Sequence, residues 1–252
     1  MRIFLLLSIF ICLSCSSKKD VVYIQDISNS NNYFNNYDSY KISIGDILNI
    51  SLMTENPDEI LLANQTNTSS FNNNKTRESL ILEGFLVNES GEISYPQIGN
   101  FKASGLTVDE FKNELVSRLE DSKILVNPIL DVKIVNWNFT ILGDVNKPGK
   151  YFFDEPNFNI LQAIGLAGDL NITGVRDDIK LLRRKNQKLD VYNIDLTKSD
   201  FLTSDAFQIV SGDIILVNQN NTKIKTAGII GNSGTLLSLL SFILSSIIVI
   251  SR

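Results

Sequence analysis

Few residues in this chain could carry catalytic chemistry. Its 252 residues include no histidine, which excludes a Ser-His-Asp triad, a histidine-based metal site and a histidine general base. The adjacent carboxylates of Asp177 and Asp178 could serve a glycosidase, but such pairs on a polar loop more often form a solvated turn. No Gly-x-x-x-x-Gly-Lys-Ser/Thr phosphate loop is present. We therefore expect no enzyme, no cofactor and no bound metal.

The residues around Cys15, near the start of the chain, favour attachment of a lipid to this cysteine. A basic residue and the apolar run Ile3 to Leu13 are typical of a secretory signal. Leu13-Ser14-Cys15 resembles the lipobox of bacterial lipoproteins, so we expect removal of residues 1–14 and lipidation of Cys15. The alternative is an ordinary signal cleaved at a nearby serine. Residues 15–39, rich in Ser, Asn and Tyr, are then expected to form a lipidated tether.

The end of the chain is a second apolar segment. No charged residue lies between Lys225 and Arg252, and residues 236–250 read LLSLLSFILSSIIVI. The Leu, Ile, Phe and Val residues favour bilayer insertion by roughly 3–7 kcal/mol, so we expect a transmembrane helix over 226–252. Its small residues share one side, which favours packing against copies of the helix or lining water, although a single anchor also tolerates serine. This stripe comprises Gly231, Gly234, Thr235, Ser238, Ser241 and Ser245.

The segment between the two ends predicts an α+β fold. The mildly acidic composition, with a net charge of −5, argues against nucleic acid as a partner. Thr107-Val108-Asp109-Glu110 is a capping box that opens an amphipathic helix over 108–120. Residues 84–95 read as a hairpin, and 54–79 as a polar insert. Further strands are expected at 129–135, 139–145, 179–184, 189–196 and 214–217, and a helix at 159–167.

Glycines mark the turns between these elements. Asn146-Lys147-Pro148-Gly149 suits a type II turn, with proline second and glycine third. Positive φ angles are expected where glycine enters a turn or ends a helix. These positions are Gly45, Gly91, Gly143, Gly149, Gly168 and Gly212.

The order and spacing of several segments resemble one family. Tyr40 to Asp46 (YKISIGD) and the segment from Gly91 to Glu110 resemble two signatures of the Wza-type polysaccharide export outer-membrane lipoproteins. Leu142 to Tyr151 and the AGDLNITGVRDD stretch resemble the SLBB module, a β-grasp-like fold, in its Bacteroidota-like version. We expect the shared positions to be structural: Gly45, Asp46, Gly91, Pro96, Gly99, Gly105, Gly143, Pro148, Gly149, Gly168, Gly212 and Asp213.

The resemblance implies an export domain at 40–135 and a single SLBB domain at 136–222, followed by the C-terminal transmembrane helix. It also implies a homo-oligomeric ring, an octamer being one option, that passes a polysaccharide cargo from the periplasm to the cell surface. Such a ring would sit in outer-membrane lipid with a periplasmic body, and its partner would be an inner-membrane polysaccharide copolymerase.

Two alternatives stay open. The chain could instead be a monomeric, membrane-anchored periplasmic lipoprotein that binds glycan or a partner. The aromatic residues Tyr33, Phe34, Tyr37 and Tyr40 could stack on sugars or pack the tether against the domain.

Overall fold

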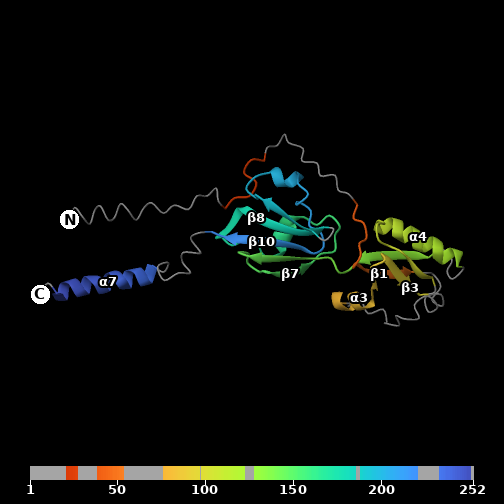
Figure 1. Cartoon of the computed structure of the whole chain (residues 1–252), viewed down its shortest axis with the longest axis horizontal. Helices are drawn as coiled ribbons and strands as arrows, with labels where there is room; N and C mark the ends of the chain where they lie inside the picture. Colours follow the sequence, from red (N-terminus) through yellow and green to blue (C-terminus); the bar gives the residue numbers. More distant parts are fainter. Residues whose placement is uncertain are drawn as a thin grey trace. The chain divides into compact units, whose positions relative to one another are not determined.

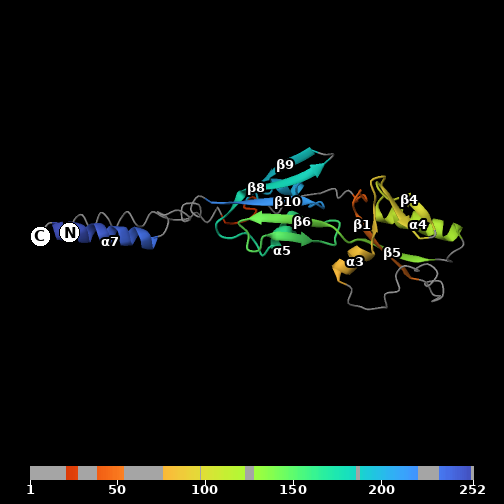
Figure 2. The same ribbon diagram turned by 60° about the horizontal axis from the view of Figure 1, so that its bottom comes forward.

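The chain forms two compact units (Figures 1 and 2), seen in a computed structural model that describes residues 21–27, 39–53, 76–96, 98–122, 128–185, 188–220 and 233–250. The N-terminal unit contains Asn36–Asn138 and Phe152–Phe158. The C-terminal unit contains Met1–Asn35, Phe139–Tyr151 and Asn159–Arg252. The mixed α and β composition expected from the sequence is confirmed.

The N-terminal unit is built on a three-stranded antiparallel sheet. Strand β1 (Ile47–Met53) lies between β2 (Phe85–Leu86) and β5 (Ile129–Ile134). Helix α4 (Val108–Asp121) begins at the predicted capping box, since Thr107 and Glu110 bond each other's backbone N–H groups. The helix lies beside β5 and buries Phe111, Leu115 and Leu119, so the amphipathic helix expected at 108–120 is confirmed.

Two local predictions for this unit are wrong. Residues 84–95 do not form a hairpin, because β2 pairs with β1, whereas β3 (Glu92–Tyr95) pairs with β4 (Gly99–Lys102). The polar insert expected at 54–79 ends earlier, because a short helix, α3 (Arg77–Glu83), begins after Thr76. Residues 54–75 lie outside the described residues.

The C-terminal unit is built on a five-stranded sheet in the order β7-β6-β10-β8-β9. Strand β10 runs parallel to β6 and antiparallel to β8, and Ile215 aligns with Ile141 and Leu181, all three fully buried. Helix α5 (Ile160–Leu166) opens with a reciprocal cap between Asn159 and Gln162. The strands are β6 (Asn138–Gly143), β7 (Gly149–Phe152), β8 (Gly174–Lys185), β9 (Lys188–Ile194) and β10 (Asp213–Gln219), and a 3-10 turn, η3, covers Asp200–Thr203.

Part of the expected tether is bonded to the C-terminal unit. The backbone N–H of Ile24 donates to the Leu196 carbonyl at 2.9 Å. The Tyr23 hydroxyl donates to Asp169 at 2.5 Å, and the buried Arg176 guanidinium lies 5.3 Å from the Tyr23 ring centre. Residues 21–27 are therefore held against the unit that contains β6 to β10.

The chain's last described element is helix α7 (Ser233–Ile250). Among the described residues, no helix has both the length and the apolar character needed to cross a membrane, so the transmembrane helix expected at 226–252 is not supported. The Ser241 hydroxyl donates to the Leu237 carbonyl at 2.8 Å and that of Ser245 to the Ser241 carbonyl at 2.7 Å. These donors are satisfied within the helix itself.

Candidate functional site

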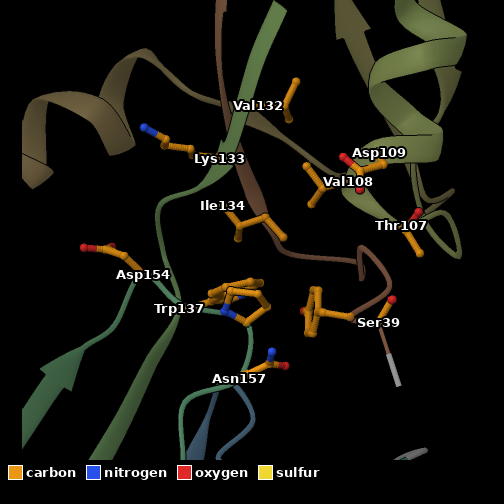
Figure 3. Close-up of a pocket in the computed structure, with 12 residues that line it drawn as sticks. Ser39, Thr107, Val108, Asp109, Val132, Lys133, Ile134, Trp137, Asp154 and Asn157 are labelled. Atoms are coloured by element: carbon orange, nitrogen blue, oxygen red, sulfur yellow. The ribbon is translucent and has the colours of Figure 1, made fainter. Parts of the chain in front are cut away.

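The N-terminal unit contains a cavity of about 350 Å³ (Figure 3). Its walls come from the start of α4, from β5 and the residues after it, and from the 152–158 segment, all within the same unit. The volume is at the lower end of small-molecule binding sites. The polar or aromatic side chains that line it include Tyr40, Asp109, Lys133, Trp137, Asp154 and Asn157.

Tyr40 is positioned by the turn that precedes β1. Gly45 adopts φ +90°, and the Asp46 N–H donates to the Ser43 carbonyl at 3.1 Å, which closes a tight turn. The Asp46 carboxylate accepts the Ser43 N–H at 2.8 Å and the Tyr40 hydroxyl at 2.9 Å. Burial, helped by the negative charge of Asp46, raises the pKa of Tyr40 to about 12, so the hydroxyl stays protonated and keeps donating.

The same turn occurs in the C-terminal unit. Gly212 adopts φ +89°, and the Asp213 N–H donates to the Val210 carbonyl while its carboxylate accepts the Val210 N–H. Each turn leads into a sheet strand, β1 or β10. The Ser-x-Gly-Asp and Val-x-Gly-Asp segments therefore have one physical role, which is to start a strand from a turn locked by a buried aspartate.

The two aspartates differ in their charge partners, and this difference predicts the effect of Asp46→Asn. Asp213 pairs with Arg183, whereas no cation pairs with Asp46 among the described residues. Burial raises the pKa of Asp46, so this carboxyl takes up a proton more readily in the folded than in the unfolded chain. We expect Asp46→Asn to cost at most about 1 kcal/mol at neutral pH, because the amide oxygen still accepts the Ser43 N–H.

The pH dependence of this variant follows from the same shift. The pKa of Asp46 is higher in the folded than in the unfolded state, so protonation of this carboxyl stabilises the fold. This stabilisation is fully present below the unfolded-state pKa and is lost as the pH rises through the folded-state pKa. The wild type should therefore gain stability over Asp46→Asn as the pH falls from 7 towards about 4.5. Urea unfolding at both pH values measures this. Parallel stability curves would contradict the assigned role of Asp46.

An aromatic row continues from Tyr40 into the unit. The Tyr40 and Trp137 rings meet edge to face at 4.7 Å between centres, and Phe153 stacks on Trp137 at 5.6 Å. Trp137 is 4% exposed, and its Nε1 has no acceptor within hydrogen-bonding distance among the described residues. It nevertheless lies close enough to the Tyr40 hydroxyl to lower that group's pKa slightly. Buried donors without an acceptor are rare in folded proteins.

The polar side chains of the cavity differ in what they already bind. Asp154 pairs with Arg77, and Lys133 pairs with Asp131 at 3.2 Å. In the part of the chain that the structure describes, the exposed side chains of Asp109 and Asn157 make no such bond. The cavity therefore presents one free carboxylate and one free amide beside an aromatic wall.

The adjacent carboxylates that were weighed for a glycosidase do not line the cavity. Asp177 and Asp178 lie on strand β8 and not on a loop, and both are exposed. The pairing of β8 with β10 shifts in register between Gly174 and Ile179, so the two aspartates lie in an irregular part of the strand. Asp178 instead accepts a hydrogen bond from Asn218 at 3.0 Å.

The glycine positions are mostly turns, as expected. Positive φ occurs at Gly45, Gly91, Gly143, Gly168 and Gly212, and in addition at Gly99 and Gly105. Gly149 is different: it begins strand β7 without a positive φ, so the predicted type II turn with glycine third is wrong. Pro148 directly precedes that strand, and Pro96 directly follows β3.

The predicted lipidation residue, the tether aromatics and the small-residue stripe are not among the described residues that line the cavity. Cys15 and Gly231 lie outside the described residues, as do Tyr33, Phe34 and Tyr37. Gly234, Thr235, Ser238, Ser241 and Ser245 lie on α7. Trp137 was not singled out in the sequence analysis. It is the chain's one tryptophan, and on that ground it could have been proposed as a site residue.

Comparison with known proteins identifies the unit that holds the cavity. Residues 35–135 match the family described as polysaccharide biosynthesis/export protein. Over these residues the chain is similar to a polysaccharide export domain. The match confirms the resemblance to the Wza-type export family drawn from the sequence, whereas the Bacteroidota-like detail and the SLBB assignment stay predictions.

Curated relatives extend the similarity beyond the export domain. The chain is 22% identical over 204 residues to the EPS I polysaccharide export outer membrane protein EpsA of Ralstonia solanacearum, covering 79% of this chain and 53% of that protein. The EpsA of Ralstonia nicotianae is 26% identical over 154 residues, 59% of this chain and 39% of the relative. The exopolysaccharide production protein ExoF of Rhizobium meliloti is 31% identical over 94 residues, 36% and 22% of the two chains.

These names describe export and not catalysis, which agrees with the expectation that the chain is not an enzyme. The chain spans about half the length of the first relative and less of the other two. The matched residues form most of the N-terminal unit and include the Tyr40–Asp46 turn and part of the cavity lining, whereas Trp137, Asp154 and Asn157 lie after them in the chain.

Proposed function

We propose that this protein is a component of a bacterial polysaccharide export apparatus and acts at the outer membrane. The observation that carries the proposal is the match of residues 35–135 to the export family, over a segment that folds as one compact unit. The names of the relatives support both the cargo and the location. The role is transport by geometry: the protein contains and guides a hydrated polymer without cleaving it.

In its finer form the proposal is a homo-oligomeric ring, tethered to outer-membrane lipid through Cys15 and working with an inner-membrane copolymerase. The small-residue face of α7 supports contact between copies. Because the Ser241 and Ser245 hydroxyls already bond their own helix, this face can approach a neighbouring helix without leaving donors unsatisfied. The units 40–135 and 136–222 are taken as the export and SLBB domains of each subunit.

Deletion and complementation in the source bacterium test the export role. We expect the deletion strain to lose most secreted polysaccharide while polymer or its precursors accumulate inside the envelope, because the exit step is missing. Wild-type protein should restore secretion, and Cys15→Ala should restore less, with the protein shifted from membrane to soluble fractions. The measurement is the hexose content of culture supernatant and cell lysate.

A matched variant separates anchoring from general damage. Ser16→Ala changes the neighbouring residue without removing the thiol and should secrete like the wild type. Normal secretion by the deletion strain would refute the export role. The molecular mass of the detergent-extracted protein tests the ring. A monomer that still supports export would contradict the ring and favour the alternative of a monomeric lipoprotein.

A further inference from the structure

The cavity of the N-terminal unit has features of a ligand site that the match to the export family does not explain. It combines an aromatic wall, Tyr40 with Trp137 behind it, and two planar polar side chains, Asp109 and Asn157, that bond nothing else in the described chain. Planar carboxylates and amides can bond adjacent hydroxyl groups, and an aromatic face covers the C–H groups of a sugar ring. The volume of about 350 Å³ suits about one or two pyranose rings.

The charges around the cavity select among sugars. Asp154 is neutralised by Arg77, and Lys133 by Asp131. Asp109 is then the lining charge without an ion partner in the described residues, so the cavity carries a net negative charge. A uronate, phosphate or sulfate group would be repelled, whereas a neutral or amino sugar would not. No group of three or more potential metal ligands occurs in the described chain, which argues against a metal ion as the occupant.

The walls are also fixed before any ligand arrives. The Tyr40 hydroxyl is held by Asp46, and the Tyr40 ring is braced against Trp137 and, behind it, Phe153. Asp109 stands in the first turn of α4, whose start is fixed by the capping box. A preorganised wall loses little conformational entropy on binding.

The unsatisfied Trp137 Nε1 lies in this wall, beside the Tyr40 hydroxyl. A buried donor without an acceptor calls for an explanation, and a bound hydroxyl group is one that the cavity could supply.

We propose that the cavity lined by Tyr40, Asp109 and Asn157 binds a neutral or amino-sugar unit of the exported polymer. This inference rests on the export role proposed above. Binding at one or two rings is weak, so a chain could be retained at the domain and still slide on to the next unit.

The chain's one tryptophan makes the proposal directly measurable. Purified full-length protein is titrated with maltohexaose, chitosan hexamer, polygalacturonate oligomers and the polysaccharide secreted by the source bacterium, while the emission of Trp137 is followed. We expect a saturable change with the secreted polymer and with the neutral or cationic oligomer, and none with the polygalacturonate oligomers.

Three variants locate the binding. Asp109→Ala and Asn157→Ala should each weaken it about tenfold, the loss of a hydrogen bond to the ligand. Glu120→Ala removes another exposed carboxylate of α4, outside the cavity, and should bind like the wild type. Unchanged thermal unfolding confirms that each variant folds.

No emission change with any of the four saccharides, or equal affinity in all three variants, would overturn the proposal. The deletion strain keeps this result separate from the export role. Lost secretion with no saccharide binding refutes the cavity site alone, whereas normal secretion with cavity-dependent binding refutes the export role alone.

Discussion

Replacing Gly143 by alanine is expected to destabilise the C-terminal unit by about 3 kcal/mol and lower its Tm by roughly 6–12 °C. Gly143 adopts φ +99°, which an L side chain rarely tolerates. A Cβ at this position would lie 2.0 Å from the Val217 carbonyl oxygen, where β6 runs directly beside β10. That oxygen cannot move away freely, because it accepts the Asp144 N–H at 3.0 Å.

Gly165→Ala is the matched control in the same unit. Gly165 lies in α5, has no positive φ, and a Cβ there would meet nothing within 4 Å. Alanine favours a helix over glycine, so this variant should gain about 0.5–1 kcal/mol. Thermal unfolding followed by circular dichroism compares the two. A Gly143→Ala protein as stable as the wild type would show that the close approach of β6 to β10 is not a constraint.

Local signals in the sequence predicted local structure well. The capping box at Thr107 and Glu110 requires residues three apart, and the turns at Gly45 and Gly212 require four successive residues. Helix α3 was missed for a physical reason: its apolar residues, Leu80 to Leu82, are consecutive and none is buried, so they show no helical spacing. Strand partners were also misjudged at 84–95, because periodicity identifies a strand without naming its neighbour.

The cavity could not have been predicted in this way. It joins the segment at Tyr40, the start of α4, strand β5 and the segment that includes Asn157. That last segment returns to the N-terminal unit after the chain has already entered the other one. The return of this segment depends on tertiary packing, here of Phe153 against Trp137. The spacing of residue types along the chain does not predict such a contact.

The second large effect is expected from Arg183→Met. The Arg183 guanidinium donates through Nε and Nη2 to the two oxygens of Asp213, at 3.0 and 2.7 Å, and its side chain is only 12% exposed. It also donates to the carbonyls of Asp205 and Gln208. Removing it leaves the Asp213 carboxylate, which is 1% exposed, without its cation, so we expect a loss of about 3–5 kcal/mol at neutral pH.

The pH dependence of the loss distinguishes the missing charge from a missing contact. Burial raises the pKa of Asp213, and Arg183 opposes that rise. Without the guanidinium the folded-state pKa rises further, so the variant regains stability as the pH falls through it and Asp213 becomes neutral. The gap to the wild type should therefore narrow between pH 7 and about pH 4.5 in urea unfolding. Lys198→Met is the control, because it breaks an exposed pair with Asp195 in the same unit and should cost at most about 1 kcal/mol of stability. Equal losses of stability in the two variants would show that the buried pair does not stabilise the turn into β10. A stability difference between Arg183→Met and the wild type that widens in acid would show the same.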